Sequence, residues 1–534
     1  MRKWLPLTAV CLGAFMLLVD VTIVTVALPD MAADLHTGFA GLQWVMDVYA
    51  LALAALLLGA GAVADRSGRR RTYLAGLGVF AAASLACGLA GGPGTLIAFR
   101  AVQGAGAAAM YATTMALLTH AYHGRDRGIA FGVWGAVNGA AAAAGPIAGG
   151  LITEHLGWRW IFFVNLPLCA LAVAVTLRSL TESRDPHARG LDVPGTAAFT
   201  VAAAAVTYAL IRGAEDGWTS PATLGLFALA ALALTAFLIV ESRCVRPLLD
   251  LALFRSPAFA GIMAASLLLS AAAFSYYLYV SLWLQSVLGL TPVGAGLALV
   301  PLSVAGFLVS ALAGRHLHAV PARLTVGGGL LLVGTGSLLQ AGLDAGDSWT
   351  ALLPGLLVTG VGVGTATPAM AAAAMAAVAP QRAGMAGGAL NTSRQLGSAL
   401  GIAVLGAVFH AGLRGALPDG SGPTADALTS GRAAELVARA PEADRAALAR
   451  LVEQAFAAGL RDTYLVAGGV GLAGGLLVLW LLRGGAAADR TANAERPGDA
   501  ERPGDVESPG RSPFPSGAAV PATGAAAVQA RLRR

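Results

Sequence analysis

The sequence predicts an all-α protein that crosses a membrane many times. Of its 534 residues, 57% are hydrophobic and only 12% are charged, and the mean hydropathy is +0.70. Soluble domains carry about 25% charged residues. Apolar runs of roughly 20 residues recur along the chain, and each is long enough to cross about 30 Å of hydrocarbon as a helix. These observations define the predicted fold class, a polytopic helical membrane protein.

Fourteen of these runs are predicted to be spanning helices. They cover residues 5–29, 44–64, 73–92, 95–119, 129–152, 160–178, 192–212, 221–241, 258–284, 293–314, 324–342, 350–375, 384–410 and 463–482. Two segments fall outside these spans. Residues 412–462 form the longest loop, with an amphipathic helix expected to break at Pro441, and residues 483–534 have the composition of a disordered tail.

Arginines in the short loops predict the orientation. Alternate connections on one side carry fifteen of them, whereas the opposite short loops carry only Arg159 and Arg212. The fifteen are Arg66, Arg69, Arg70, Arg71, Arg125, Arg127, Arg178, Arg184, Arg189, Arg243, Arg246, Arg255, Arg315, Arg323 and Arg382. The positive-inside rule therefore places both termini in the cytoplasm. This topology accounts for the net charge of +6 better than nucleic-acid binding does.

The residue inventory argues against the usual enzyme classes. Lys3 is the only lysine, so the chain lacks the phosphate-binding lysine of a P-loop ATPase and a Schiff-base lysine. The motifs HExxH, GxSxG and CxxC are absent, and the four cysteines are scattered without metal-ligand spacing. A GxGxxG run at 469–474 falls inside the last apolar span, where glycines favour helix packing. We therefore expect no catalytic centre, metal, cofactor or ATP.

A few polar residues lie inside apolar spans, where a charge costs about 2.5–3.5 kcal/mol. Asp20 lies about 22 Å into the first span at 1.5 Å per residue. Arg100, Gln103 and Gly104 share one face of the fourth span at i, i+3 and i+4. Both charges are candidates for coupling, with a structural contact between helices as the alternative. Asp47, one turn into the second span, is a weaker candidate because acids favour helix N-termini anyway.

Two further motifs suggest close helix packing. The turn after the second span reads "GAVADRSGRRR" and contains Gly61, Asp65, Arg66, Gly68, Arg69 and Arg70; topology alone explains its arginines but not Asp65 or the glycine spacing. The fifth span contains Gly145, Pro146, Gly149 and Gly150. Proline kinks a helix and small residues admit a close neighbour. Such helices suit a bundle that rocks, although many static bundles also contain them.

Taken together, the motifs resemble the major facilitator superfamily, in particular its fourteen-span drug–proton antiporter branch. The similar stretches are "LLVDVTIVTVALP", "GAVADRSGRRR", "RAVQGAGAA", "GPIAGG", "WRWIFFVNLP" and "GGALNTSRQLGSALGIAVLG". The resemblance implies two six-helix halves, residues 1–180 and 258–482, with two linker helices in residues 181–257. It also implies alternating access and export driven by proton entry.

The resemblance further assigns roles to residues. Asp20 would take a proton or contact a cationic substrate, Arg100 would tune that carboxylate, and Asp65 with Arg66 and Arg69 would latch the cytoplasmic side. The corresponding second-half turn keeps only Gly314-Arg315, so the latch is expected to depend on the first half. Cavity candidates, for which helix packing is the alternative, are Tyr276, Tyr277, Trp283, Gln285, Asn391 and Arg394.

The predicted function is proton-driven efflux of drugs or antibiotics across a bacterial plasma membrane. The expected partners are an amphipathic or cationic small molecule, protons and the lipid bilayer, with the protein acting as a monomer and without nucleic acid. Two alternatives remain: a proton-coupled transporter of one metabolite or self-made product, and a membrane sensor or scaffold that transports nothing. The sequence does not identify the substrate.

Overall fold

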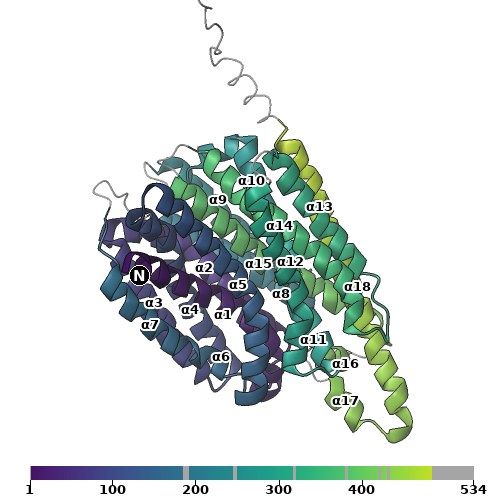
Figure 1. Cartoon of the computed structure of the whole chain (residues 1–534). Helices are drawn as coiled ribbons and strands as arrows, with labels where there is room; N and C mark the ends of the chain where they lie inside the picture. The colour runs from purple at the N-terminus through teal and green to yellow at the C-terminus, as the bar shows by residue number, and fades with distance from the viewer. Residues whose placement is uncertain are drawn as a thin grey trace, which may run out of the picture. The chain divides into compact units, whose positions relative to one another are not determined.

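The computed structural model describes residues 2–184, 192–244, 249–316, 320–378, 383–418, 422–429 and 433–483 (Figure 1). All regular secondary structure within these ranges is helical. The predicted disordered tail, apart from Arg483, and parts of several loops lie outside them.

The first part of the chain forms seven helices, followed by a two-helix hairpin. They are α1 (Leu5–Leu35), α2 (Phe39–Ser67), α3 (Arg69–Gly88), α4 (Pro93–Ala121), α5 (Gly124–Leu156), α6 (Trp160–Phe163), α7 (Asn165–Ser179), α8 (Val193–Asp216) and α9 (Pro221–Arg243). The remainder forms α10 (Pro257–Ala273), α11 (Tyr277–Ser286), α12 (Pro292–His316), α13 (Ala322–Gln340), α14 (Leu353–Ala376), α15 (Ala383–Gly415), α16 (Gly422–Thr429), α17 (Ala433–Arg439) and α18 (Glu442–Leu481). Short 3₁₀ turns are η1 (Arg2–Trp4), η2 (Leu251–Arg255) and η3 (Trp349–Leu352).

The helix boundaries follow local chemistry. Proline, whose missing N–H is not needed in the first turn, opens α4, α9, α10 and α12. The side chains of Asp192 and Ser220 accept hydrogen bonds from the backbone N–H groups of Gly195 and Thr223, which caps α8 and α9. Gly68, with φ +115°, makes the turn between α2 and α3.

Every predicted span coincides with a helix or a pair of consecutive helices, so the all-α fold class is confirmed. Eleven helical segments of the described chain are long and apolar enough to cross a membrane. The helices α3, α4 and α5 do not meet that criterion; all three are rich in Ala and Gly, and α3 and α5 also carry several charges. The chain is a multi-pass membrane protein, and the number fourteen remains a prediction.

The helices pack according to one scheme that occurs twice. In the first part, α1 and α3 each contact α4 and α7, and α2 packs on α4. In the second part, α10 and α13 each contact α14 and α18, and α12 packs on α14. The correspondence pairs the first, third, fourth and sixth helices of each predicted half. The halves meet along two seams, α2 against α15 and α5 against α12.

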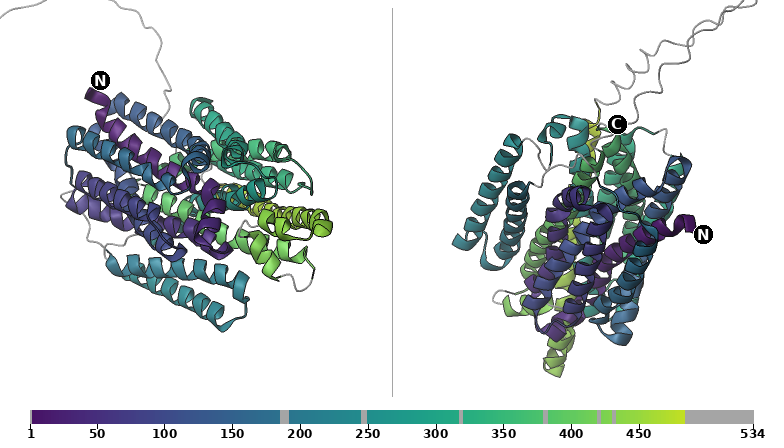
Figure 2. Two further views of the ribbon diagram at one scale, coloured as in Figure 1. Left: turned by 90° about the horizontal axis from the view of Figure 1, so that it is seen from below. Right: turned by 90° about the vertical axis from the view of Figure 1, so that its left-hand side faces the viewer.

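Two features lie outside this scheme. The hairpin α8–α9 lies at the edge of the bundle, where α8 contacts α2 and α15 (Figure 2). The helices α16 and α17 and the start of α18 project beyond the other helices (Figure 1). The expected break at Pro441 is confirmed. However, α18 runs unbroken from Glu442 to Leu481, so the last span is the end of a longer helix and does not start a separate one near residue 463.

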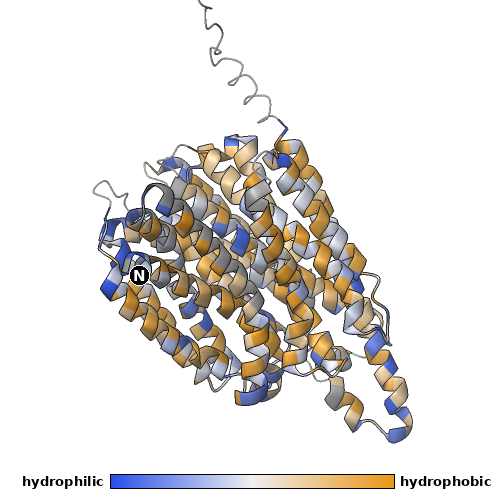
Figure 3. Cartoon of the chain, viewed as in Figure 1, coloured by the Kyte–Doolittle hydropathy of each residue, from blue (hydrophilic) through white to orange (hydrophobic). Residues whose placement is uncertain are grey.

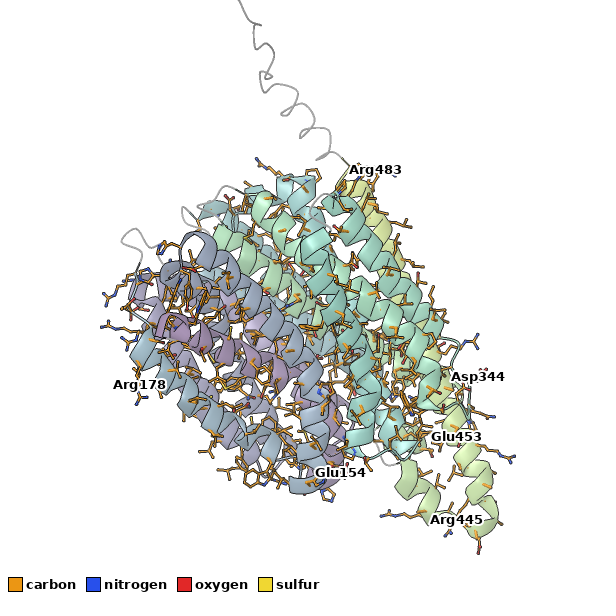
Figure 4. All side chains as sticks on the ribbon, in the orientation of Figure 1. Glu154, Arg178, Asp344, Arg445, Glu453 and Arg483 are labelled. Carbon is orange, nitrogen blue, oxygen red and sulfur yellow. The ribbon has the colours of Figure 1, made fainter. Side chains whose placement is uncertain are left out.

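Polar residues concentrate at the ends of the helices and on the projecting segment, while the middle of the bundle is mainly apolar (Figure 3). In Figure 4, Arg178 and Arg483 lie toward one end of the bundle, and Glu154, Asp344, Glu453 and Arg445 lie toward the other. We call the end that holds the α1–α2 turn the distal end. Arg159, which follows α5, donates hydrogen bonds there to Asp34 at the end of α1 and to the carbonyl of Ala90 after α3.

Candidate functional site

A buried ion pair joins α1 and α4 inside the first half. Nη1 of Arg100 lies 2.5 Å from Oδ2 of Asp20, and the two side chains are 1% and 0% exposed. The sequence placed both charges at membrane depth, and the structure brings them together. Each charge offsets part of the other's desolvation, which an isolated ion could not do in this environment.

Amide groups complete the network around Asp20. Gln103 and Asn165 donate hydrogen bonds to its Oδ1 over 2.8 and 3.0 Å. Both amides also donate to the hydroxyl of Ser84, and Arg100 donates from Nε to the carbonyl of Val45 and from Nη1 to Gln103. One carboxylate is therefore tied to four other helices: α4 and α7 directly, α3 through Ser84 and α2 through Arg100.

Close helix packing supports this arrangement. The guanidinium carbon of Arg100 lies 4.3 Å from the ring centroid of Tyr49, a favourable cation–π contact. Gly104 lets α4 approach α2, since a Cβ at this position would lie 2.6 Å from the carbonyl oxygen of Tyr49. The predicted face of Arg100, Gln103 and Gly104 thus combines two polar ligands of Asp20 with a contact that requires glycine.

Asp47 contrasts with Asp20. It is fully buried, and neither of its carboxylate oxygens has a hydrogen-bond partner among the described residues. One turn away on α2, Gln43 donates to the carbonyl of Ile402 and to the hydroxyl of Tyr279, across the seam with α15. An unpaired buried carboxylate costs several kcal/mol, and a bound proton removes the cost of the charge but not that of the missing hydrogen bonds.

The α5 motif of Gly145, Pro146, Gly149 and Gly150 lies where α5 contacts α1 and α12. A Cβ at Gly145 would overlap Thr22, and one at Gly149 would lie 2.7 Å from the carbonyl oxygen of Ile23. Toward α12, a Cβ at Gly150 would lie 2.6 Å from the carbonyl oxygen of Pro292, and Gly296 of α12 lies directly against Pro146. These small residues allow the backbone of α5 to approach the backbones of α1 and α12 closely.

The turn between α2 and α3 is organised by contacts with nearby acidic side chains. Asp65 accepts hydrogen bonds from Nε and Nη2 of Arg69 over 3.0 and 2.8 Å, while Arg66 is exposed. Glu182, which the sequence did not single out, accepts from the backbone N–H groups of Arg70 and Arg71 and so caps α3. Gly68 lies against the Glu182 carboxylate, whereas Gly61 faces open space.

The six cavity candidates are distributed over several contacts. Tyr276, Tyr277 and Trp283 are buried in the apolar core, and Gln285 donates to the carbonyl of Val26 on α1. Among the described residues, Asn391 donates a hydrogen bond to the carbonyl of Gly387 in its own helix. Arg394 of α15 donates to the hydroxyl of Tyr111 on α4 over 3.1 Å, which bridges the two halves.

Comparison with known proteins decides the family. The sequence profile of the Major Facilitator Superfamily matches residues 10–402. The chain belongs to the major facilitator superfamily. The family predicted from the motifs is therefore confirmed, and it is a family of transporters.

Relatives within the superfamily are named as drug-resistance proteins. The chain is 39% identical over 414 residues to the "Multidrug resistance protein Stp" of Mycobacterium tuberculosis, with 77% of each chain covered. It is 35% identical over 509 residues to the "Tetracenomycin C resistance and export protein" of Streptomyces glaucescens, covering 90% of this chain and 91% of the relative.

The fold also has a solved counterpart. A bacterial homologue of the human lysosomal transporter Spinster, crystallised in an inward-facing and unoccupied conformation, aligns with a TM-score of 0.62. The alignment covers 90% of this chain and 97% of that one at 17% sequence identity. The helices described above therefore have the arrangement of a major facilitator fold.

Proposed function

We propose that this transporter exports drugs or antibiotics across the bacterial plasma membrane in exchange for protons. The observation that carries the proposal is the buried Asp20–Arg100 pair, together with the resistance functions named for its relatives. The protein works as a monomer, with both termini in the cytoplasm and the distal end outside.

The coupling step is a change of charge at Asp20. A proton arriving at Oδ2 neutralises the carboxylate and weakens its bond to Nη1 of Arg100. Arg100 still retains the carbonyl of Val45 and the amide oxygen of Gln103, so the cation is not left without partners. A proton that moves down about 100 mV supplies roughly 2.3 kcal/mol.

Asp47 provides a second acid in the same half. Its carboxyl group is buried and has no hydrogen-bond partner among the described residues, an environment that favours the neutral, protonated form. When the α2–α15 seam opens and water enters, the proton leaves and the acid becomes able to attract a cationic group. Asp20 and Asp47 thus change charge in different conformations.

Alternating access uses the contacts between the halves. In the present conformation, Gln43 with Ile402, Gln285 with Val26 and the α5 motif with α12 hold the distal end together. In the opposite state the distal contacts separate, and the Asp65 turn, with Arg66 and Arg69, latches the cytoplasmic side. The latch depends on the first half.

The substrate is an amphipathic small molecule. One relative is named for export of a single compound, tetracenomycin C, which makes export of one natural product the second candidate function. A panel of toxic compounds, applied to cells with and without the protein, separates the two: multidrug export protects against several unrelated compounds and single-product export against one.

Inverted membrane vesicles test the proton coupling. We expect wild-type vesicles to take up ethidium when a pH gradient is imposed, and Asp20→Asn vesicles to lose the response to the gradient. Asp126→Asn is the matched control, because Asp126 forms an ion pair with Lys3 at the surface, 2.7 Å away. Full coupled export by Asp20→Asn would contradict the assignment.

The non-transporting alternative has a separate test. Reconstituted protein in liposomes should exchange labelled substrate across the membrane without any gradient. A sensor or scaffold predicts no exchange at all, for the wild type as well as for the variants.

A further inference from the structure

The second half contains a buried polar cluster in the helices that correspond to those of the ion network. In the first half, Asp20, Ser84, Arg100 and Asn165 lie on α1, α3, α4 and α7, the first, third, fourth and sixth helices. In the second half, the polar groups lie at the break between α10 and α11 and on α13, α14 and α18. They are Tyr276, Ser337, Gln340, Thr359 and Tyr464, which we call the second-half cluster.

Direct contacts hold the cluster together. Nε2 of Gln340 donates to the hydroxyl of Tyr276 over 3.4 Å. The rings of Tyr276 and Tyr464 meet edge to face with centroids 5.2 Å apart. Thr359 lies against Gly336, one turn from Gln340, and Ser337 shares the face of Gln340 on α13. Each of the five side chains is at most 1% exposed.

The cluster differs from the ion network in two respects. First, all five members are neutral side chains, so the cluster itself carries no formal charge. Second, several of its polar atoms have no hydrogen-bond partner among the described residues, including Oη of Tyr464, Oε1 of Gln340 and Oγ of Ser337. Leaving such atoms unsatisfied costs about 1–3 kcal/mol each.

The local backbone is also interrupted here. Between α10 and α11 the chain leaves the helix at Phe274–Tyr276, at membrane depth. Irregular backbone at this depth is tolerated where it is buried in protein or lines a cavity, and broken helices form the binding sites of many transporters. Tyr276 thus lies at a point where the helix can change direction.

We propose that the second-half cluster binds the uncharged, oxygen-bearing aromatic part of a substrate. Tyr276 and Tyr464 offer ring edges and faces for stacking, Gln340 offers an amide acceptor, and the hydroxyl groups can donate or accept. A ligand with phenol, quinone or ketone groups matches this set, whereas a permanent cation does not. The proposal rests on the proposed export function. It specifies the class of substrate that the second half of the transporter would recognise.

The test uses isosteric variants of the unsatisfied groups. Tyr464→Phe, Gln340→Leu and Ser337→Ala are reconstituted in liposomes and titrated with tetracenomycin C, a polycyclic aromatic compound rich in hydroxyl and carbonyl groups. We expect each variant to raise Kd about threefold to tenfold, the size of one lost hydrogen bond. Export of ethidium should be unchanged. The unfolding temperature should stay the same or rise for Tyr464→Phe and Ser337→Ala, whereas Gln340→Leu also removes the hydrogen bond to Tyr276 and should lower it.

Tyr73→Phe is the matched control. Tyr73 is a fully buried tyrosine of α3 whose hydroxyl donates to the carbonyl of Ala9 over 2.8 Å. Its variant should lower the unfolding temperature and leave the tetracenomycin C Kd unchanged. This pattern, opposite to that of Tyr464→Phe and Ser337→Ala, separates loss of ligand contacts from loss of packing.

Several outcomes overturn the proposal. If the three cluster variants bind tetracenomycin C as the wild type does, water alone satisfies these groups. If the wild type exports ethidium but does not bind tetracenomycin C, the subsite is refuted while the export function stands. If the wild type transports neither compound and protects cells against none, the proposed function itself fails.

Discussion

The two halves of the transporter use one packing scheme for different chemistry. Both place polar side chains on their first, third, fourth and sixth helices. In the first half these groups include an acid and a base, and Asp20 accepts hydrogen bonds from three side chains. In the second half the corresponding helices carry hydroxyl and amide groups, several of them without a hydrogen-bond partner among the described residues. A repeated architecture therefore does not imply a repeated function.

The contrast has an energetic meaning. Charges in hydrocarbon are retained only where they are paired, so a complete network marks a place where charge is handled. A neutral polar group without a hydrogen-bond partner costs less free energy than an unpaired charge, so it can remain free to bind a ligand. The proposed division places proton handling in the first half and neutral recognition in the second, and the following experiments test it.

Breaking the ion pair should have the largest effect. Arg100→Met leaves Asp20 buried without its cation, and we expect a loss of about 3–5 kcal/mol of stability. The double variant Asp20→Asn/Arg100→Met removes both charges and should recover part of this loss. Thermal unfolding of the purified protein measures both, and a double variant at least as unstable as Arg100→Met would contradict the predicted recovery.

Widening a side chain at the seam should have the next largest effect. Gly149→Leu places atoms against the Ile23 carbonyl and should cost about 1–3 kcal/mol and abolish export. Gly61→Ala is the control, because that position is open, and alanine should stabilise the helix by about 0.5–1 kcal/mol. The two glycine variants should therefore shift the unfolding temperature in opposite directions.

A matched serine pair compares the halves most directly. Ser84 and Ser337 are both fully buried on the third helix of their half. Ser84→Ala removes an acceptor for Gln103 and Asn165 and should cost about 1–2 kcal/mol. Ser337→Ala removes an unsatisfied hydroxyl and should leave the unfolding temperature unchanged or higher. Equal losses of stability for the two variants would contradict the proposed difference between the two halves.

The smallest effect is expected at the α2–α3 turn. Glu182→Gln weakens the cap on the N–H groups of Arg70 and Arg71, and we expect a loss of about 0.5–1 kcal/mol. Because the Glu182 carboxylate is partly exposed to solvent, raising the salt concentration should reduce the difference between wild type and variant. A loss of several kcal/mol of stability would mean that Glu182 does more than cap the start of α3.

Much of the fold could be predicted from the sequence, because the bilayer sets the length of the apolar spans and the side on which arginines lie. Both features can therefore be recognised in the sequence. Asp20, Arg100 and Gln103 were recognisable for the same reason, since polar groups inside apolar runs need partners. The α5 glycines were recognisable from their spacing. Their contact with both α1 and α12 emerged only from the structure.

Other site residues carried a weaker signal. Ser84, Asn165, Thr359 and Tyr464 are neutral, and such residues occur in spans without a function, so their role depends on which helices are neighbours. Glu182 lies in a loop, where an acid is unremarkable, until Gly68 brings the start of α3 against it. Likewise, α18 begins long before its apolar part, because its polar first turns continue the same helix.

The web around Asp20 also has a mechanical consequence. Directly or through one intermediate, it fastens α1 to α2, α3, α4 and α7, so these five helices share a single stiff cross-link. The α5 seam, by contrast, is built from glycines facing backbone, with little side-chain interlocking to resist sliding. When the transporter changes conformation, the helices should move most where the contacts between them resist movement least. We therefore expect the first half to move as a rigid body, with most of the sliding between helices occurring along α5.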